Sequence, residues 1–340
     1  MQHNQKNHSL RSARVKKKVV IGIGGNAILE NGQSGSFEEQ LRNITRTASK
    51  IVSIVSNACD FEIVALTHGN GPQVGVISLQ QDMSPSVLPR QPMHALVAMT
   101  QGQLGYMIQQ ALQNEFMKAG ITKPVVSVVT QTLVDKDDPD FSKETPSKPI
   151  GPLYTQEEAK ELSENTQYIF SKVKPIGERI WRRMVPSPIP REIIESDVVM
   201  KLADFGCIVI ASGGGGIPVI RNGHGYCGVD GVVDKDLVTG LLGKSVGASV
   251  LLILTDIDTV KLNFGKPNET AISQMSMQEA IQHFKDGQFL NGSMGPKIRS
   301  SIEFLESGGE LAIITSIDNA IDALNGKAGT RIVKSLGQVS

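Results

Sequence analysis

Short apolar runs alternate along the chain with longer stretches whose apolar residues recur at helical spacing. In the stretch 36–57, Leu41, Ile44 and Ala48 fall on one face of a helix, whereas residues 19–23 form a β-branched run typical of a buried strand. The same criteria predict further strands at 61–66, 124–130, 207–211, 250–255, 311–315 and 330–334, and helices at 74–81, 94–118, 192–204, 235–243, 296–306 and 319–324. This alternation predicts an α/β fold with a mainly parallel sheet and helices on both faces.

The stretch 135–190 interrupts this alternation. It is polar, holds many of the prolines and includes one short predicted helix at 156–162. Because structureless connections of this length are uncommon inside a compact domain, we expect a small protruding subdomain, placed as a lid, and not a disordered linker.

Glycine motifs follow three of the predicted strands. Four consecutive glycines at 213–216 come after the strand 207–211, and shorter motifs follow the strands 19–23 and 61–66. Glycine costs conformational entropy, so such runs indicate close approach of the backbone to a ligand, with N–H groups turned toward an anion. Three such strand ends predict a phosphate-rich site at one edge of the sheet.

Composition narrows the classes of partner. The chain has 34 basic and 34 acidic residues, and 4% of its residues are aromatic, which gives no argument for binding nucleic acid or an anionic membrane. No apolar run approaches the roughly 20 residues that a membrane span needs. The cysteines Cys59, Cys207 and Cys227 show no CxxC spacing, which favours a reducing compartment without structural zinc.

The first 18 residues carry basic side chains and no acidic one. Two interpretations stay open: a disordered, solvated arm, or an organelle-targeting segment, since such segments are basic and acid-poor. We expect a cytoplasmic protein, with an organelle of energy metabolism as the alternative if this segment is a targeting signal.

Three lysines lie in loops shaped by glycine or proline. Lys148 lies between two prolines, Lys235 lies at a predicted helix start, and Lys297 follows a glycine–proline pair. Any one of them alone would most simply be a solvated surface charge. Phosphoryl transfer, however, needs positive charge around the transferring group more than it needs covalent chemistry. We therefore expect the three lysines to supply that charge and Asp236 to orient them, while Asp234 does the same or caps the helix.

Other motifs are weak or absent. The pattern Gly-x-Gly-x-x-Ala at 22–27 matches a dinucleotide-binding fingerprint only formally, because the second strand ends in His68 and not in an acidic residue. No Walker A motif occurs. His68 stays open between a buried, loop-fixing histidine and a substrate contact. Asn26 and Asn70 could donate to oxyanions or occupy left-handed turn positions, or do both.

These residues lie in blocks that resemble the carbamate kinases of the amino acid kinase family, from about Lys18 to the C-terminus. The matching blocks are GGNA (24–27), THGNGPQVG (67–75), VAMTQGQLGYM (97–107), KPIGP (148–152), WRRMVPSP (181–188), GGGGIPV (213–219), VVDKDL (232–237), LTDID (254–258) and GSMGPK (292–297). Many amino acid kinases have a lysine where this chain has Gly22; carbamate kinases have a small residue there and carry a lysine on the lid, matching Lys148. The run 174–181 departs from the family's Gly-Arg-Gly-Trp-Arg pattern.

The resemblance implies an open, mainly parallel three-layer α/β/α sandwich with a protruding subdomain. The chain then divides into a basic arm (1–17), an amino acid kinase domain (18–334) that contains the lid (135–190), and a C-terminal tail (335–340). It also implies a homodimer.

The implied reaction is reversible, Mg²⁺-dependent phosphoryl transfer between carbamoyl phosphate with ADP and carbamate with ATP, often in the direction of ATP formation at the end of arginine breakdown. By matching motif, Lys148, Lys235 and Lys297 would stabilise charge, with Asp236 organising them. Gly24, Gly25, Asn26, Gly69 and Asn70 would hold carbamate and the transferred phosphoryl group, and Gly214, Gly215, Thr255 and Asp256 would lie toward the nucleotide. No protein side chain is assigned as a metal ligand. Carbamate is already a nucleophile, so direct in-line transfer is expected, without a strong general base.

Three rivals remain. Another amino acid kinase would act on a different small acid, and Gly22 and the KPIGP block argue against it. A ligand sensor on the same fold should have lost one or more of the three lysines, all of which are present. A dehydrogenase would need to bind NAD.

Overall fold

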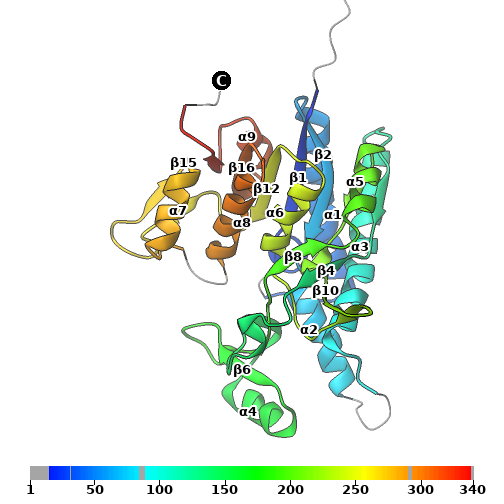
Figure 1. The fold of residues 1–340 in the computed structure, drawn as a ribbon, viewed down its shortest axis with the longest axis vertical. Coiled ribbons are helices and arrows are strands. Elements are labelled where there is room, and N and C mark those ends of the chain that lie inside the picture. The colour runs from blue at the N-terminus through cyan, green and yellow to red at the C-terminus, as the bar shows by residue number, and fades with distance from the viewer. Residues whose placement is uncertain (1–14, 31, 84–88, 290–292, 338–340) are drawn as a thin grey trace, which may run out of the picture.

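The computed structural model describes residues 15–30, 32–83, 89–289 and 293–337 and has an α/β architecture (Figure 1). Its main sheet runs in the order β15 (Gln274–Ser276), β17 (Thr330–Val333), β16 (Leu311–Ser316), β12 (Val250–Thr255), β1 (Lys17–Ile23), β2 (Phe61–His68), β9 (Ile208–Ile210) and β3 (Val125–Ser127). All neighbours pair in parallel except β16 and β17. The predicted α/β class with a mainly parallel sheet is confirmed.

The central strand β1 aligns the edge at which the glycine motifs lie. Its residues Val19, Val20 and Ile21 are fully buried, as expected for a strand covered on both faces. Ile23, the last residue of β1, pairs with His68 of β2 and with Leu254 of β12. The carboxyl ends of these three strands therefore meet at one edge, the place where open parallel sheets bind ligands.

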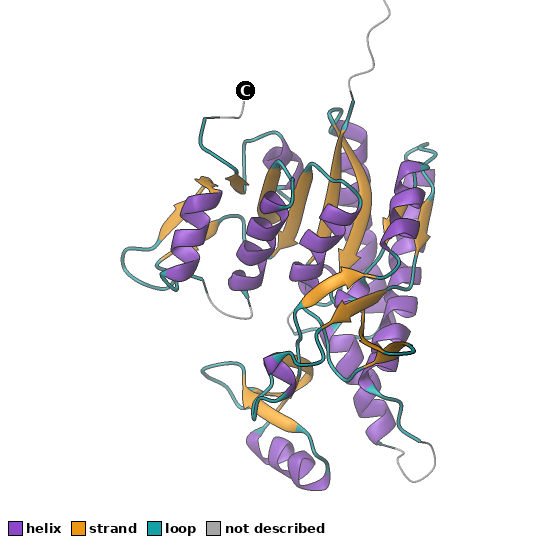
Figure 2. Cartoon of the chain, viewed as in Figure 1, coloured by secondary structure: helices purple, strands orange, loops and turns teal. Residues whose placement is uncertain are grey.

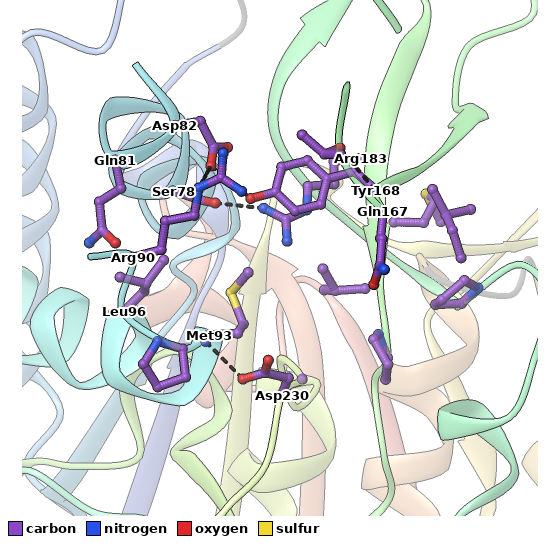
Figure 3. Close-up of a pocket in the computed structure, with 18 of the residues that line it drawn as sticks. Ser78, Gln81, Asp82, Arg90, Met93, Leu96, Gln167, Tyr168, Arg183 and Asp230 are labelled. Atoms are coloured by element: carbon purple, nitrogen blue, oxygen red, sulfur yellow. Dashed lines mark hydrogen bonds and ion pairs between the residues drawn. The ribbon is translucent and has the colours of Figure 1, made fainter. Parts of the chain in front are cut away.

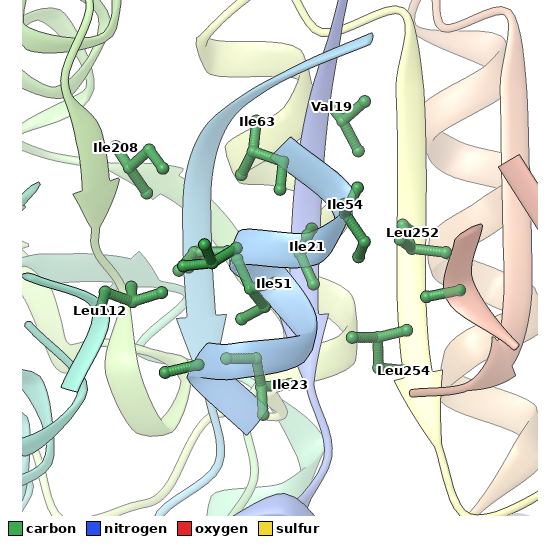
Figure 4. Close-up of a cluster of buried hydrophobic side chains, with 14 of the residues drawn as sticks. Val19, Ile21, Ile23, Ile51, Ile54, Ile63, Leu112, Ile208, Leu252 and Leu254 are labelled. Atoms are coloured by element: carbon green, nitrogen blue, oxygen red, sulfur yellow. The ribbon is translucent and has the colours of Figure 1, made fainter. Parts of the chain in front are cut away.

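Helices cover both faces of the main sheet and make a three-layer sandwich. One face carries α1 (Phe37–Asn57), α3 (Met93–Lys118) and α9 (Ala320–Leu324), and the other carries α5 (Ser196–Asp204), α6 (Lys235–Ser245), α7 (Met277–Lys285) and α8 (Met294–Glu306). Successive strand side chains point to opposite faces, so Ile21 packs in the first core and Val20 in the second. Figure 4 shows the first core, where Ile51 and Ile54 of α1 lie over Ile21 and Ile63.

Smaller sheets lie at the carboxyl edge and beyond it (Figure 2). One has the order β11 (Gly225–Gly228), β10 (Ile217–Asn222), β4 (Gln131–Val134) and β8 (Pro190–Ile193). Another, β5 (Lys148–Tyr154), β7 (Trp181–Val185) and β6 (Ile169–Lys172), carries α4 (Gln156–Asn165) and protrudes from the body in Figure 1. We call residues 135–189, which include this second unit, the lid; Pro190, the last residue of the expected lid, already belongs to β8. The chain leaves for the lid after β4 and returns through β8, which pairs with β4.

The remaining elements are short or lie at the periphery. They are α2 (Gly71–Asp82), the hairpin β13 (Val260–Leu262) and β14 (Thr270–Ile272), and the single turns η1 (Gly25–Ala27), η2 (Pro139–Phe141) and η3 (Gly213–Gly215).

Three features of the fold differ from the sequence-based expectation. The predicted helix 192–204 begins only at Ser196, because residues 190–193 pair with β4 as strand β8. The predicted strand 124–130 is limited to Val125–Ser127. The lid strands, the β4-containing sheet and α7 were not predicted, since pairing between short strands far apart in sequence leaves no periodicity in a single segment.

Two expectations concern membranes and targeting. Within the described part of the chain, no helix has the length and apolar character to cross a membrane. Residues 1–14, which make up most of the basic segment, lie outside the described residues.

Candidate active site

A cleft of about 560 Å³ opens at the carboxyl ends of β1, β12 and β16. Gly24 and Gly25 line it from the loop after β1, and Thr255 and Asp256 line it from the end of β12. Lys235 and Lys297 reach it from the first turns of α6 and α8. The structure thus brings six of the predicted site residues into one cavity.

A buried charge cluster forms one wall of this cleft. The Nζ of Lys235 lies 2.5 Å from Asp236 Oδ1, and the Nζ of Lys297 lies 2.9 Å from Asp236 Oδ2. The three side chains are only 12%, 7% and 12% exposed for Lys235, Asp236 and Lys297. One carboxylate therefore orients two ammonium groups and leaves the cluster with a net positive charge toward the cleft.

The pKa values in the cluster follow from burial and from these ion pairs. Burial opposes ionisation of Asp236, but the two ammonium groups outweigh it and hold the pKa of that carboxyl well below its usual range. Burial and the neighbouring Lys297 lower the pKa of Lys235, against the attraction of Asp236. For Lys297 the attraction of Asp236 outweighs burial and raises its pKa.

The third predicted lysine is held by a different carboxylate. Asp234 is the N-cap of α6, where its Oδ1 accepts a hydrogen bond from the Asp236 backbone N–H at 2.9 Å. Its other oxygen, Oδ2, lies 2.6 Å from the Nζ of Lys148, the first residue of the lid strand β5. Asp236 thus organises Lys235 and Lys297, whereas Asp234 both caps the helix and ties the lid lysine to the body.

Glycines allow the backbone to come close at the end of β1. A Cβ on Gly24 would lie 2.9 Å from the Leu254 carbonyl oxygen, and a Cβ on Gly22 would lie 2.7 Å from Thr239 Oγ1. A larger residue would not fit at position 22, because α6 packs directly on β1 there. Asn26 follows within η1, and its side chain lies outside what the structure describes.

The four-glycine loop packs against β2 and does not line the cleft. Gly214 and Gly215 are buried with positive φ values of 65° and 88°, a conformation that favours glycine. A Cβ on Gly214 would lie 2.2 Å from the Asn70 side chain, and a Cβ on Gly215 would lie 2.3 Å from the Val233 carbonyl oxygen. The loop therefore packs beneath the start of α6, because Val233 lies two residues before Lys235.

His68 and Asn70 pack against the same loop. The His68 ring is buried against Gly213, its Nδ1 lies 3.0 Å from the Gly69 carbonyl oxygen, and burial lowers its pKa from 6.5 to about 4. The Asn70 amide donates to Thr100 Oγ1 at 2.8 Å and is buried. Gly69 contacts the Lys235 stem, since a Cβ there would lie 3.5 Å from its Cδ. His68 is thus a buried, loop-fixing histidine.

The sequence analysis missed several residues of the cleft, among them Ser316. Ser316 lines it from the end of β16, and its Oγ is buried without a hydrogen-bond partner. The sequence could have predicted Ser316, because it directly follows the predicted strand 311–315 and ligands bind at the carboxyl ends of parallel strands.

A larger cavity of about 700 Å³ lies between the lid and helices α2 and α3 (Figure 3). Several of its polar groups bond to one another. Tyr168 donates to Asp82 Oδ1 at 2.8 Å, and Arg90 Nε lies 3.1 Å from the same oxygen. Arg183 donates to Ser78 Oγ at 2.5 Å. We interpret this cavity as the junction through which the lid packs on the body.

Comparison with known proteins defines the class. The family model of the amino acid kinase family matches residues 17–316, and the chain belongs to that family. It is accordingly a phosphotransferase.

Individual relatives narrow the class to one activity. The carbamate kinase of Thermococcus kodakarensis is 48% identical over 94% of this chain and 99% of its own length. Two structures of carbamate kinase from Giardia lamblia, one bound to citric acid and one bound to AMP-PNP, superpose with TM-scores of 0.87 and 0.84 at 42% and 44% identity. Each alignment covers 94% of this chain and 99% of the other. Within its family, the chain groups with the carbamate kinases.

Proposed function

We propose that this protein transfers a phosphoryl group reversibly between carbamoyl phosphate and ADP, giving carbamate and ATP. The observation that carries the proposal is the Lys235–Asp236–Lys297 cluster on the wall of the cleft. Its two oriented ammonium groups suit the negative charge that is spread over a transferring phosphoryl group. The carbamate kinase relatives support the choice of acceptor.

The residue roles follow from position. Thr255 and Asp256, at the end of β12, lie on the nucleotide side of the cleft, and the AMP-PNP complex of the Giardia relative supports a nucleotide there. The loop at Gly24 and Gly25 lies between this side and the lid. Lys148 would add its charge from the lid to the transferring group, and Gly69 would contribute backbone beside Lys235.

Transfer would be direct and in line. Carbamate attacks the γ-phosphoryl group without needing a strong general base, and the buried His68, with a pKa of about 4, is poorly placed to act as one. Carbamoyl phosphate is labile in water, so a lid over the site would help to exclude water during transfer. The ion pair between Lys148 of the lid and Asp234 of the body supports this arrangement.

Mg²⁺ is proposed to enter with the nucleotide. The described residues contain no group of three or more His, Cys, Asp or Glu side chains placed to hold a metal ion, while Glu30, Asp256 and Asp318 line the cleft. Phosphate oxygens would therefore be the main ligands, with at most a carboxylate from the cleft. The chemistry supplied by the bound ion would be neutralisation of phosphate charge.

The remaining elements of the proposal concern assembly and setting. We propose a homodimer, supported by the exposed apolar side chains Met99 and Tyr106 on α3, which are 44% and 53% exposed. We propose a cytoplasmic enzyme that makes ATP at the end of arginine breakdown, as the family resemblance suggests.

The test is ATP formation from ADP and Mg²⁺ with a panel of acyl phosphates. Carbamoyl phosphate should be preferred over acetyl phosphate by about 100-fold or more in kcat/KM, because a site built for the carbamoyl amide loses a hydrogen bond with the methyl analogue. Equal or better use of another acyl phosphate would point to a different amino acid kinase. Nucleotide binding without ATP formation from any of them would favour the sensor.

A further inference from the structure

A second cavity adjoins the nucleotide cleft on the side of the lid. It has a volume of about 620 Å³ and shares Gly25 and Glu30 with the cleft. Its walls come from the first turn of α1, from α2 and from the lid, where Gly151 and Arg182 line it. The glycine loop after β1 therefore separates two cavities. A phosphoryl group transferred between a ligand in one cavity and a ligand in the other would pass Gly25.

The two neighbouring arginines of lid strand β7 have different surroundings. Successive residues of a strand point to opposite faces. Arg183 faces the junction shown in Figure 3, where its guanidinium lies 3.3 Å from the centre of the Tyr168 ring and donates to Ser78. Arg182 lines the second cavity, and its Nε is buried without a hydrogen-bond partner. Among the described residues, none forms an ion pair with Arg182.

The charge balance of the second cavity is positive. Arg182 and Lys174 both line it, and its one acidic side chain, Glu30, already forms an ion pair with Arg46. Burial lowers the pKa of Arg182, and no carboxylate compensates this loss of hydration. Arg182 is half-buried as a whole, but its Nε is fully buried without a partner. Partial burial of a cation without a counter-charge is unfavourable, and native structures rarely leave a buried donor unused without a functional reason.

We propose that Arg182 binds the anionic acyl phosphate substrate in this second cavity, across Gly25 from the nucleotide. This proposal rests on the proposed function, because a reaction between two anionic substrates needs two anion-binding cavities that meet at the point of transfer. The cleft holds the nucleotide phosphates beside Lys235 and Lys297, and the second cavity holds the smaller anion. Arg182 is a substrate-binding residue of the lid, so binding of the acyl phosphate would also draw the lid toward the glycine loop.

The steady-state test compares Arg182→Met with a matched control on the same subdomain. Methionine keeps much of the apolar stem and removes the charge. The loss of charge-assisted hydrogen bonds should raise the KM for carbamoyl phosphate by about 10- to 100-fold, and the KM for ADP should stay within about twofold. The control is Lys160→Met, because Lys160 is exposed on the lid helix α4 and pairs with Glu164. It should leave both constants within about twofold.

A binding measurement separates this proposal from the proposed function. Phosphonoacetamide, a stable isostere of carbamoyl phosphate, is titrated calorimetrically into the wild-type protein, Arg182→Met and Arg182→Lys. We expect wild-type binding, partial binding by the lysine variant, and a loss of about 10-fold or more in the methionine variant. An unchanged affinity in Arg182→Met, with the thermal midpoint preserved, would overturn the role of Arg182 even if the enzyme makes ATP. Wild-type binding that depends on Arg182 without ATP formation would keep the anion site and remove the proposed reaction.

Discussion

The α/β body and the lid hold their site lysines in different ways. In the body, Lys235 and Lys297 share the carboxylate of Asp236, and all three groups are nearly buried. The lid contributes Lys148, which meets the body through one ion pair with Asp234 at 24% and 14% exposure. In the body, the two ammonium groups are therefore held in place before a ligand binds. In the lid, the position of the Lys148 ammonium group depends on a single ion pair. We therefore expect nucleotide binding to depend on the body, and stabilisation of the transferring group to depend on the lid as well.

The largest effect should come from breaking the buried charge cluster of the body. Asp236→Asn leaves Lys235 and Lys297 close together and buried without a counter-charge. Removing one partner of a buried ion pair costs about 3–5 kcal/mol, so the free energy of unfolding should fall by that amount in urea titrations. Asp234→Asn, which loosens only the contact to the lid and keeps an N-cap side chain, should cost clearly less. Equal losses in the two variants would contradict the distinction between body and lid.

A second way to sharpen the comparison uses pH, because the buried histidine belongs to the body. Burial lowers the His68 pKa from 6.5 to about 4, so the unfolded chain binds a proton between these values that the folded chain does not bind. Above about pH 6.5, His68 is neutral in both states and does not change the free energy of unfolding. As the pH falls from about 6.5 to 4, His68 lowers this free energy by about 3 kcal/mol in total. Unfolding free energies measured from pH 7 to pH 4 check this.

The matched control for the pH series is His68→Gln, which keeps an amide donor near the Gly69 carbonyl group and removes the titration. The difference between its pH slope and that of the wild type isolates the histidine, since the other groups titrate in both. Parallel slopes would show that His68 is not held neutral in the folded body.

A smaller effect should arise where the lid packs on the body. Gly75 of α2 and Gly151 of β5 touch backbone to backbone, and a Cβ on Gly75 would lie 2.1 Å from the Gly151 Cα. Gly75→Ala should therefore displace β5, lower the free energy of unfolding by about 1–3 kcal/mol and reduce kcat, while ADP affinity stays unchanged. Gly223→Ala, in the turn between β10 and β11, is the control, because open space surrounds that position. A loss of ADP affinity in Gly75→Ala would show that the lid also shapes the nucleotide site.

The same comparison explains how much the sequence could predict. The body strands are continuous apolar runs buried on both faces, so β1, β2, β12 and β16 were predicted within a few residues. The lid strands are short and half-buried, and their pairing joins residues as distant as Lys148 and Val185. The hydrophobic pattern therefore predicted a protruding polar subdomain but not its three-stranded sheet.

The candidate site divides in a similar way. Lys235, Lys297 and Asp236 were predicted, and the structure brings them together, because helix starts after parallel strands converge at one edge. The sequence could not predict whether Lys148 forms its ion pair with Asp234 or with Asp236. The structure shows that it pairs with Asp234, whose side chain also caps α6. Gly214 and Gly215 were assigned to the nucleotide side by the family resemblance, and the structure packs them against Asn70 and Val233. Glycine signals close approach, but the sequence does not say to what.

The most direct test of the division between body and lid is the kinetics of Lys148→Ala beside Lys160→Ala, a control at an exposed lid lysine on α4. ATP formation from carbamoyl phosphate, ADP and Mg²⁺ gives kcat, and calorimetry gives the Kd for ADP. For Lys148→Ala we predict a fall in kcat of about 100-fold or more with a Kd within about threefold of wild type, and no change in the control. A kcat within a few-fold of wild type, or a matching loss of ADP affinity, would contradict the assignment of Lys148 to the transferring group.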